Sequence, residues 1–321
     1  MKAREDLAKV LILHGGVVAG LFVLGFVLPE YHHGVLARVL VLSAFAMGYN
    51  ILFGYAGLLS LGHAMFFAAG LYGAGLPMVH LGWSAPAGLA SGIALGAALA
   101  LVVGLLALRT VGVAFMIVTM MFSQVFYLST LYFSEWTRGD DGLVIPQAQR
   151  GMGLFGVWYD LSQPMTRYMA ALALFTVLLA ASLAIARSRF GRVLVAIREN
   201  EERTRMLGYD TFANKLAAVV VSGAFCAAAG AAYALLFGYF GSTFAAVQYS
   251  IFPLLWVLLG GAATVLGPFL GTLLMYYAVD IISGYTSAYM LAVGLLLILL
   301  VLYFPKGVLG TLRERWLRWL P

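Results

Sequence analysis

Residues 48–76 read GYNILFGYAGLLSLGHAMFFAAGLYGAGL. Their apolar residues follow one another without the polar–apolar alternation of a strand, which favours membrane helices over a membrane β-barrel. Glycines in such a stretch let neighbouring helices approach closely or interrupt the helix, and here they include Gly54, Gly57, Gly62, Gly70 and Gly73. The stretch therefore predicts helical structure inside a membrane, with room for irregular geometry.

Polar side chains within this apolar stretch include Asn50, Tyr55, Ser60 and His63. In ordinary helix packing, such groups are satisfied by hydrogen bonds inside the bundle. Alternatively, they line a polar path, because polar groups in membrane spans usually face a cavity or the bundle interior. The residues alone leave both interpretations open.

The composition of the whole chain agrees with a membrane protein. Of its 321 residues, 63% are hydrophobic and 10% are charged, and the mean hydropathy is +0.97. A soluble protein carries about 25% charged residues, so soluble enzymes, disordered regulators and nucleic-acid binders are excluded. Cys226 is the single cysteine, which excludes an intrachain disulfide.

Outward from the quoted stretch, ten apolar runs are candidates for membrane segments. A crossing helix needs about 20 apolar residues, so the run 249–265 is short for one. The first run is too long for a signal-peptide core and is predicted to be a retained helix. We expect an all-α, polytopic protein with about ten apolar segments, at least one irregular or half-spanning. The runs are 10–28, 35–53, 58–78, 85–108, 111–133, 168–186, 213–238, 249–265, 267–283 and 286–304.

The positive charges predict the orientation of these segments. With a cytoplasmic N-terminus and six crossings before residue 187, fifteen of the 19 Lys and Arg residues lie on one side. The other side keeps only Arg38, Arg138, Arg150 and Arg167. Positive residues accumulate on the cytoplasmic side, so both termini are expected there. The basic character of the chain then reflects topology and lipid headgroup contacts, not a nucleic-acid partner.

Three polar regions interrupt the apolar pattern. Residues 134–167 are expected to form an exoplasmic loop, either solvated at the membrane interface or a docking surface. In the cytoplasmic region 187–215, the spacing predicts an amphipathic helix between Arg192 and Leu207. Its acidic residues Glu199, Glu201 and Glu202 repel an anionic membrane and favour a protein partner. The basic, tryptophan-containing C-terminal tail, with Trp316 and Trp319, is expected to anchor at the lipid interface.

The sequence lacks the motifs of an enzyme. It contains no P-loop, no metal-spaced His/Cys set and no GxSxG elbow, so we expect no catalytic residues, no cofactor and no metal site. Asp280 is the only acidic residue within an apolar run, whereas secondary transporters usually carry ionisable groups at mid-membrane. The energy for transport is therefore supplied by another protein, or the conduit is passive.

The sequence resembles the permease subunits of branched-chain amino acid ABC importers of the LivM-like type. The resemblance begins with GYN, LFGYAG and LSLGHA in the quoted stretch. It continues through TRGDDGL at 137–143, AIRENEERTRMLGYD at 196–210, LLGGAATVLGPFLGTLL at 258–274 and YFPKGVLG at 303–310. Leu58 stands where the family often has glutamine, which leaves the substrate open.

The resemblance implies one transmembrane permease domain over residues 1–321, in a bacterial inner membrane. The implied partners are a homologous permease subunit or a second copy, two cytoplasmic ATPases and an exoplasmic solute-binding protein. The implied roles are a translocation path with Asn50, Tyr55, Ser60 and His63; ATPase coupling through Arg198, Glu199, Asn200 and Glu201; and binding-protein contact through Arg138, Asp140 and Asp141.

The implied substrate is a branched-chain or other hydrophobic amino acid. Family members also carry urea, amides and other small organic solutes, so these remain alternatives. The rival from another class is a stand-alone facilitator for a small neutral solute, which the near absence of charge within the apolar runs favours.

Overall fold

The computed structural model describes residues 2–154, 157–304, 306–315 and 319. Seven of its helices are long and apolar enough to cross a membrane. Each corresponds to one of the apolar runs in the sequence, so the expected all-α, polytopic architecture is confirmed. They are α1 (Lys2–Val27), α2 (Glu30–Asn50), α3 (His63–Leu81), α4 (Ala85–Ala107), α5 (Val113–Tyr132), α7 (Pro164–Arg187) and α10 (Thr211–Phe237).

Three further apolar helices are shorter than a full crossing. These are α11 (Gln248–Gly260), α12 (Gly267–Ser283) and α13 (Tyr289–Tyr303). The 13 residues of α11 extend about 20 Å, whereas the hydrocarbon core of a bilayer is about 30 Å thick. The short run 249–265 is thus an irregular segment, as its length predicts.

One predicted span begins elsewhere. The run 58–78 is helical only from His63, where α3 begins, because residues 56–62 are not helical, which agrees with the room for irregular geometry that the glycines predict. Immediately before this gap, α2 continues as a π-helix over Ile51–Tyr55. Gly57 has φ +72°, a left-handed conformation that glycine adopts readily, and it ends the helix there.

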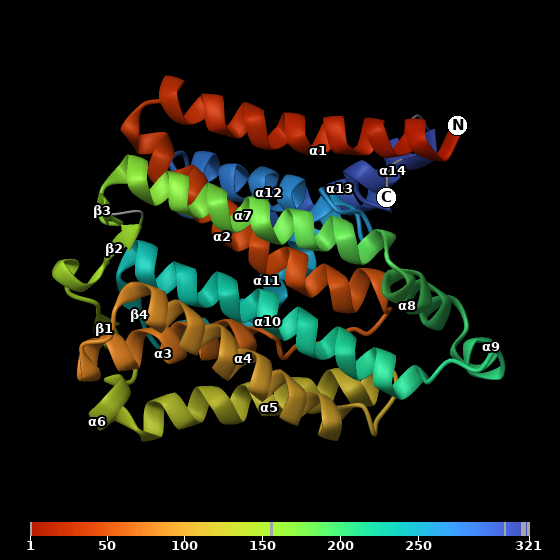
Figure 1. The fold of residues 1–321 in the computed structure, drawn as a ribbon, viewed down its shortest axis with the longest axis horizontal. Coiled ribbons are helices and arrows are strands. Elements are labelled where there is room, and N and C mark those ends of the chain that lie inside the picture. The colour runs from red at the N-terminus through yellow and green to blue at the C-terminus, as the bar shows by residue number, and fades with distance from the viewer. Residues whose placement is uncertain (1, 155–156, 305, 316–318, 320–321) are drawn as a thin grey trace.

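Successive long helices along the chain run in alternating directions, and α1 and α5 lie at opposite edges of the bundle (Figure 1). The start of α1 and the helix α14 (Val308–Arg315) lie at the same end as α8 (Arg189–Glu199) and α9 (Glu201–Met206). We call this the terminal end. The tail residues 316–318, including the expected anchor Trp316, lie outside the described residues.

The opposite end carries the short elements of residues 134–163. They are α6 (Ser134–Thr137), β1 (Leu143–Val144), η2 (Gln147–Gln149), β2 (Gly151–Leu154) and β3 (Val157–Asp160). β1 pairs antiparallel with β4 (Tyr239–Phe240), which follows α10, and β2 pairs with β3. The first part of this expected loop is therefore held against the end of α10.

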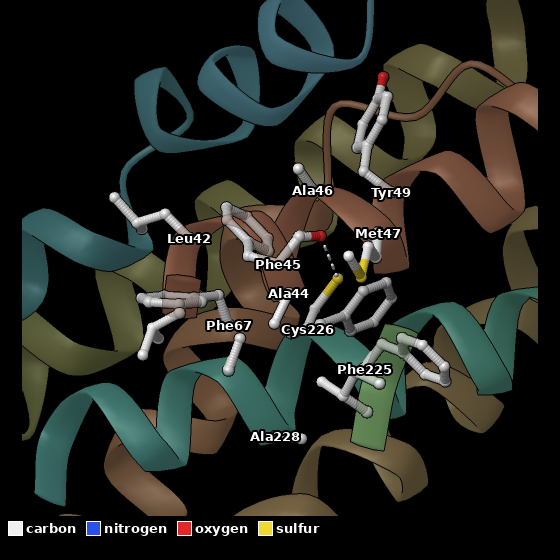
Figure 2. Close-up of a cluster of buried hydrophobic side chains, with 14 of the residues drawn as sticks. Leu42, Ala44, Phe45, Ala46, Met47, Tyr49, Phe67, Phe225, Cys226 and Ala228 are labelled. Carbon is white, nitrogen blue, oxygen red and sulfur yellow. Dashed lines mark hydrogen bonds between the residues drawn. The ribbon is translucent and has the colours of Figure 1, made fainter. Parts of the chain in front are cut away.

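The core forms where α2, α3, α4 and α10 meet through small residues. A Cβ atom on Gly230 would collide with the backbone oxygen of Phe67, and one on Gly70 with that of Ala227. In the adjoining cluster of Figure 2, the Cys226 thiol donates to the Phe45 carbonyl oxygen across 3.7 Å. Close approach of this kind is typical of helices packing within a membrane.

Candidate functional site

The interruption between α2 and α3 is held by a hydrogen-bonded asparagine. Asn50 donates from Nδ2 to the Thr264 carbonyl oxygen at 2.9 Å, and its Oδ1 accepts from the Ala263 backbone N–H at 3.0 Å. Both acceptor and donor belong to the short connection between α11 and α12. Asn50 is 3% exposed, so it joins two chain interruptions inside the protein.

Ala263 has φ +56°, which places a non-glycine residue in the left-handed region. Its N–H binds Asn50, and its carbonyl oxygen accepts from the Arg313 guanidinium at 3.2 Å. Side chains from α2 and α14 therefore hold both sides of this residue in place.

His63, the first residue of α3, belongs to a second buried network. The Ser222 hydroxyl on α10 donates to the Gly48 carbonyl oxygen at 2.6 Å. Its oxygen is 2.9 Å from Nε2 of His63. Because the hydroxyl proton is used toward Gly48, His63 acts as the donor from Nε2. The imidazole is fully buried and lies 4.5 Å from the Tyr49 ring, centroid to centroid.

Ser60 shapes the non-helical residues between α2 and α3. Its hydroxyl accepts from the Gly62 N–H at 3.1 Å, and its carbonyl accepts from the Tyr49 hydroxyl at 3.1 Å. The first turn of α3 then receives a partner from α11, because the Ser250 hydroxyl accepts from the Ala64 N–H at 2.8 Å. The irregular backbone is thus satisfied by side chains, as a chain buried in a membrane requires.

Tyr55 closes the π-helix toward the terminal end. Its side chain is 6% exposed, and its hydroxyl has no hydrogen-bond partner among the described residues. The structure thus brings all four predicted path residues to the interruption. Asn50, Ser60 and His63 make hydrogen bonds there, whereas the Tyr55 hydroxyl does not.

The predicted coupling helix over 192–207 is wrong in one respect, because it is two helices. Asn200 has extended backbone angles (φ −161°, ψ 104°) between α8 and α9. Its Oδ1 accepts from the Arg203 N–H at 2.9 Å, which caps α9. The cap satisfies a backbone donor that a helix start leaves free.

Arg198 connects α8 with the interruption of α2. Its guanidinium donates to the Gly54 carbonyl oxygen at 2.5 Å, inside the π-helix. The stem of the same side chain packs against Gly57, where a Cβ would lie 2.7 Å from Arg198 Cγ. Arg198 is therefore a direct contact between α8 and the π-helix.

Glu201 holds α9 against the start of α10. Its Oε1 accepts from Lys215 Nζ at 2.7 Å and from Arg205 at 3.3 Å. Partial burial acts to raise the pKa of the Glu201 carboxyl, but the hydrogen bond and charge of Lys215 outweigh it, so the pKa is lowered. Glu199, by contrast, is exposed and forms no ion pair among the described residues.

A cavity of about 680 Å³ opens beside Arg198 at the terminal end. Its walls come from the π-helix, the end of α7 with α8, the end of α11 with the connection to α12, and α14 with the residues before it. The charged residues of the lining are Arg198, Glu199, Lys306, Arg313 and Glu314.

The three predicted binding-protein contacts lie at the other end of the bundle. Arg138, Asp140 and Asp141 are exposed. Asp140 Oδ1 also accepts from the Ser242 hydroxyl at 2.5 Å, which ties this surface to the segment after β4. The exposed charges thus rest on a supported backbone.

Several residues of these networks were not predicted from the sequence. Ser222, Lys215, Thr264 and Arg313 all bind side chains or backbone far away in the chain. Lys215 is the one with a signal, since a lysine near the start of an apolar helix needs a partner. Among the residues that the structure describes, no group of three or more His, Cys, Asp or Glu could hold a metal ion.

Comparison with known proteins identifies the family. The family described as the permease component of branched-chain amino acid transport systems matches residues 32–304. The high-affinity branched-chain amino acid transport permease LivM of Escherichia coli K12 is 29% identical over 84% of this chain and 68% of its own.

A LivM protein of the same description from Salmonella typhimurium is 30% identical over 84% of this chain and 68% of its own length. A probable LivM permease of Methanocaldococcus jannaschii is 32% identical over 37% of this chain and 39% of its own. No solved structure matches the chain. The chain belongs to the permease-component family of branched-chain amino acid transport systems, and it is a multi-pass membrane protein.

Proposed function

We propose that the chain is the membrane-spanning subunit of an ATP-driven importer for branched-chain or other hydrophobic amino acids. The family membership supports the transport role. The absence of a P-loop from the sequence agrees with hydrolysis on separate subunits. The proposed assembly contains a second permease chain, two cytoplasmic ATPases and an exoplasmic solute-binding protein, in a bacterial inner membrane with both termini cytoplasmic.

The observation that carries the proposal is the contact of Arg198 with Gly54. α8 and α9 form a projecting charged segment at the terminal end (Figure 1), and Arg198 joins that segment to the π-helix of α2. A π-helix within an α-helix frequently marks a functional position. Movement of the ATPases would pull on α8, and the π-helix would convert that pull into a rearrangement of the path.

In this mechanism, Asn50, Tyr55, Ser60 and His63 belong to the moving section of the path. The hydrogen bonds of Asn50, Ser60 and His63 connect α2 and α3 with α10 and the connection after α11. A change at the π-helix therefore reaches each of these elements. Hinge motion at such a position opens one side of a transporter as the other side closes.

The surface at the other end, with Arg138, Asp140 and Asp141, would receive the binding protein. These side chains are exposed at the end opposite α8, on a backbone held by Thr137 and Ser242. A supported charged surface suits a repeatedly docking partner, because charge complementarity increases the rate of association.

The test is purification of the tagged chain in mild detergent, with identification of the retained proteins. Recovery of P-loop ATPases and a permease, followed by ATP-dependent leucine uptake in proteoliposomes with the binding protein, is the expected result. Urea or amide uptake in place of leucine would keep the mechanism and change the substrate. Solute flux through the isolated chain without ATP would contradict the proposal and favour a facilitator.

A further inference from the structure

The cavity at the terminal end has the volume of a ligand site. Its roughly 680 Å³ lies within the range of about 300–1,000 Å³ typical of small-molecule pockets. Four segments distant in sequence build its walls, contributing Tyr55, Arg198, Thr264 and Arg313 among others. Such a cavity persists only while those segments keep their relative positions.

Each arginine of the cavity is held in position by one hydrogen bond and keeps further N–H donors free. Arg198 uses one guanidinium nitrogen on the Gly54 carbonyl, and Arg313 uses one on the Ala263 carbonyl. Neither forms an ion pair among the described residues. A guanidinium has five N–H donors, so each arginine keeps donors for an anionic group while its position is already set.

The acidic residues of the cavity divide into a paired and an unpaired group. Glu314 pairs with Lys306, which neutralises both, whereas Glu199 has no ion pair in the described part of the chain. The lining therefore offers free cationic donors and one free carboxylate within a single cavity. A ligand with one negative and one positive group would complement both.

The cavity also contains an unsatisfied buried polar group. The Tyr55 hydroxyl is buried without a hydrogen-bond partner among the described residues, and the side chain belongs to the lining. An unpaired buried hydroxyl costs free energy. A bound polar ligand would supply the missing partner.

The remaining wall is apolar. Leu258, Val195, Ala186 and Ala262 line the cavity beside the charged residues. A short aliphatic side chain would lose its contact with water against this wall, which is favourable for binding. The ligand chemistry is thus a zwitterion with an aliphatic side chain.

We infer that the cavity binds a hydrophobic α-amino acid at the terminal end of the protein. Arg198 and Arg313 bind its carboxylate, Glu199 binds its ammonium group, and the aliphatic wall contacts its side chain. The choice of an amino acid rests on the proposed function, which makes this end cytoplasmic. The site then holds amino acid that has already been imported.

The experiment measures binding of radiolabelled leucine to the full-length chain in nanodiscs of phosphatidylcholine. Arg313→Gln is expected to weaken binding about tenfold or more, because it removes a charge-assisted hydrogen bond. Tyr55→Phe deletes a single hydroxyl and is expected to weaken binding about fivefold. Arg315→Gln, on the same helix but outside the lining, is the matched control and should change binding less than twofold.

Two analogues test the zwitterion. Leucinol lacks the carboxylate and 4-methylpentanoic acid lacks the ammonium group, so neither should displace leucine at concentrations where valine does. Equal displacement by leucinol, or unchanged leucine binding in both Arg313→Gln and Tyr55→Phe, would overturn the inference. So would retention of phosphatidylethanolamine, with no leucine bound, because a lipid headgroup also combines an anion with an ammonium group.

Uptake by the assembled transporter separates this inference from the proposed function. Leucine uptake without Arg313-dependent binding to the chain would refute the site and leave the importer standing. Arg313-dependent binding without ATP-driven uptake would refute the importer and leave the site standing. With both correct, leucine on the terminal-end side should slow uptake in the wild type and slow it less in Arg313→Gln.

Discussion

The polar groups around α10 and those at the terminal end differ in how completely the protein satisfies them. Inside the bundle, His63, Ser222 and Gly48 bind one another, with Nδ1 of His63 left without a partner among the described residues, and Asn50 uses both ends of its amide. At the terminal end, Arg198 and Arg313 each keep free donors, and the Tyr55 hydroxyl has no partner among the described residues. The first group specifies the fold, whereas the second remains available for partners.

The burial of the helices shows the same division. In α2, α3 and α10, 89%, 72% and 78% of the residues in an apolar 18-residue stretch of the helix are buried. The same share is 22% in α1 and in α5. The buried helices therefore position the interruption after α2, while α1 and α5 leave most of their surface exposed. Four substitutions would break or sharpen this contrast.

The largest effect is expected from Gly230→Ala on α10. Its Cβ would collide with the Phe67 backbone oxygen, which cannot move without separating α3 from α10. We expect little or no folded protein by size-exclusion chromatography in detergent. Gly16→Ala on α1 is the control, because its Cβ meets nothing within 4 Å, and it should purify like the wild type. Equal yields of Gly230→Ala and Gly16→Ala would show that the close contact between α3 and α10 is not required for folding.

Ser222→Ala is expected to cost about 2 kcal/mol, since it leaves the His63 donor and the Gly48 acceptor without their partner. The measurement is thermal unfolding in detergent. Ser129→Ala should cost less than about 0.5 kcal/mol, because the Ser129 hydroxyl binds only a carbonyl of its own helix. Equal stability of the two variants would remove the evidence for a fold-specifying network.

Arg198→Gln should leave the melting temperature nearly unchanged and lower transport-coupled ATPase activity about tenfold, since one charge-assisted hydrogen bond to Gly54 is lost. The readout is ATP hydrolysis stimulated by the binding protein in proteoliposomes. Arg192→Gln, an exposed arginine of the same helix, should keep wild-type coupling. Normal coupling in Arg198→Gln would exclude this contact as the connection.

Glu201→Gln should have the smallest effect, a loss of about 0.5–1 kcal/mol, because the pair with Lys215 is partly exposed. The pKa of Glu201 is lowered, with partial burial opposing the stronger effect of Lys215, so the pair stabilises the fold above the ordinary carboxyl range. That stability disappears as pH falls through the lowered pKa.

Melting temperatures of wild type and Glu201→Gln should therefore differ at neutral pH and converge in acid. Glu202→Gln should match the wild type throughout, because Glu202 is exposed and forms no ion pair among the described residues. A constant difference at all pH values would assign the effect to something other than ionisation of Glu201.

The apolar runs predict most of the helices, because a membrane demands long uninterrupted hydrophobic segments. The split at Asn200 also has a signal that the helical spacing overrode: asparagine followed by Glu201 and Glu202 is typical of a helix start. The interruption after Tyr55 is less predictable, since glycine fits both close packing and a helix break. Pairs such as His63 with Ser222 could not be predicted, because hydropathy does not indicate which distant helices touch.

Ala263 places backbone strain in the connection between α11 and α12. An alanine at φ +56° costs about 1 kcal/mol relative to an ordinary conformation, and hydrogen bonds with the side chains of Asn50 and Arg313 help to hold it there. Loss of either contact would allow the backbone at Ala263 to relax to an ordinary conformation. Loss of the Arg313 contact alone would then weaken the connection between α2 and α14 at Ala263, while the hydrogen bonds of His63 with Ser222 and of Ser222 with Gly48 stay intact.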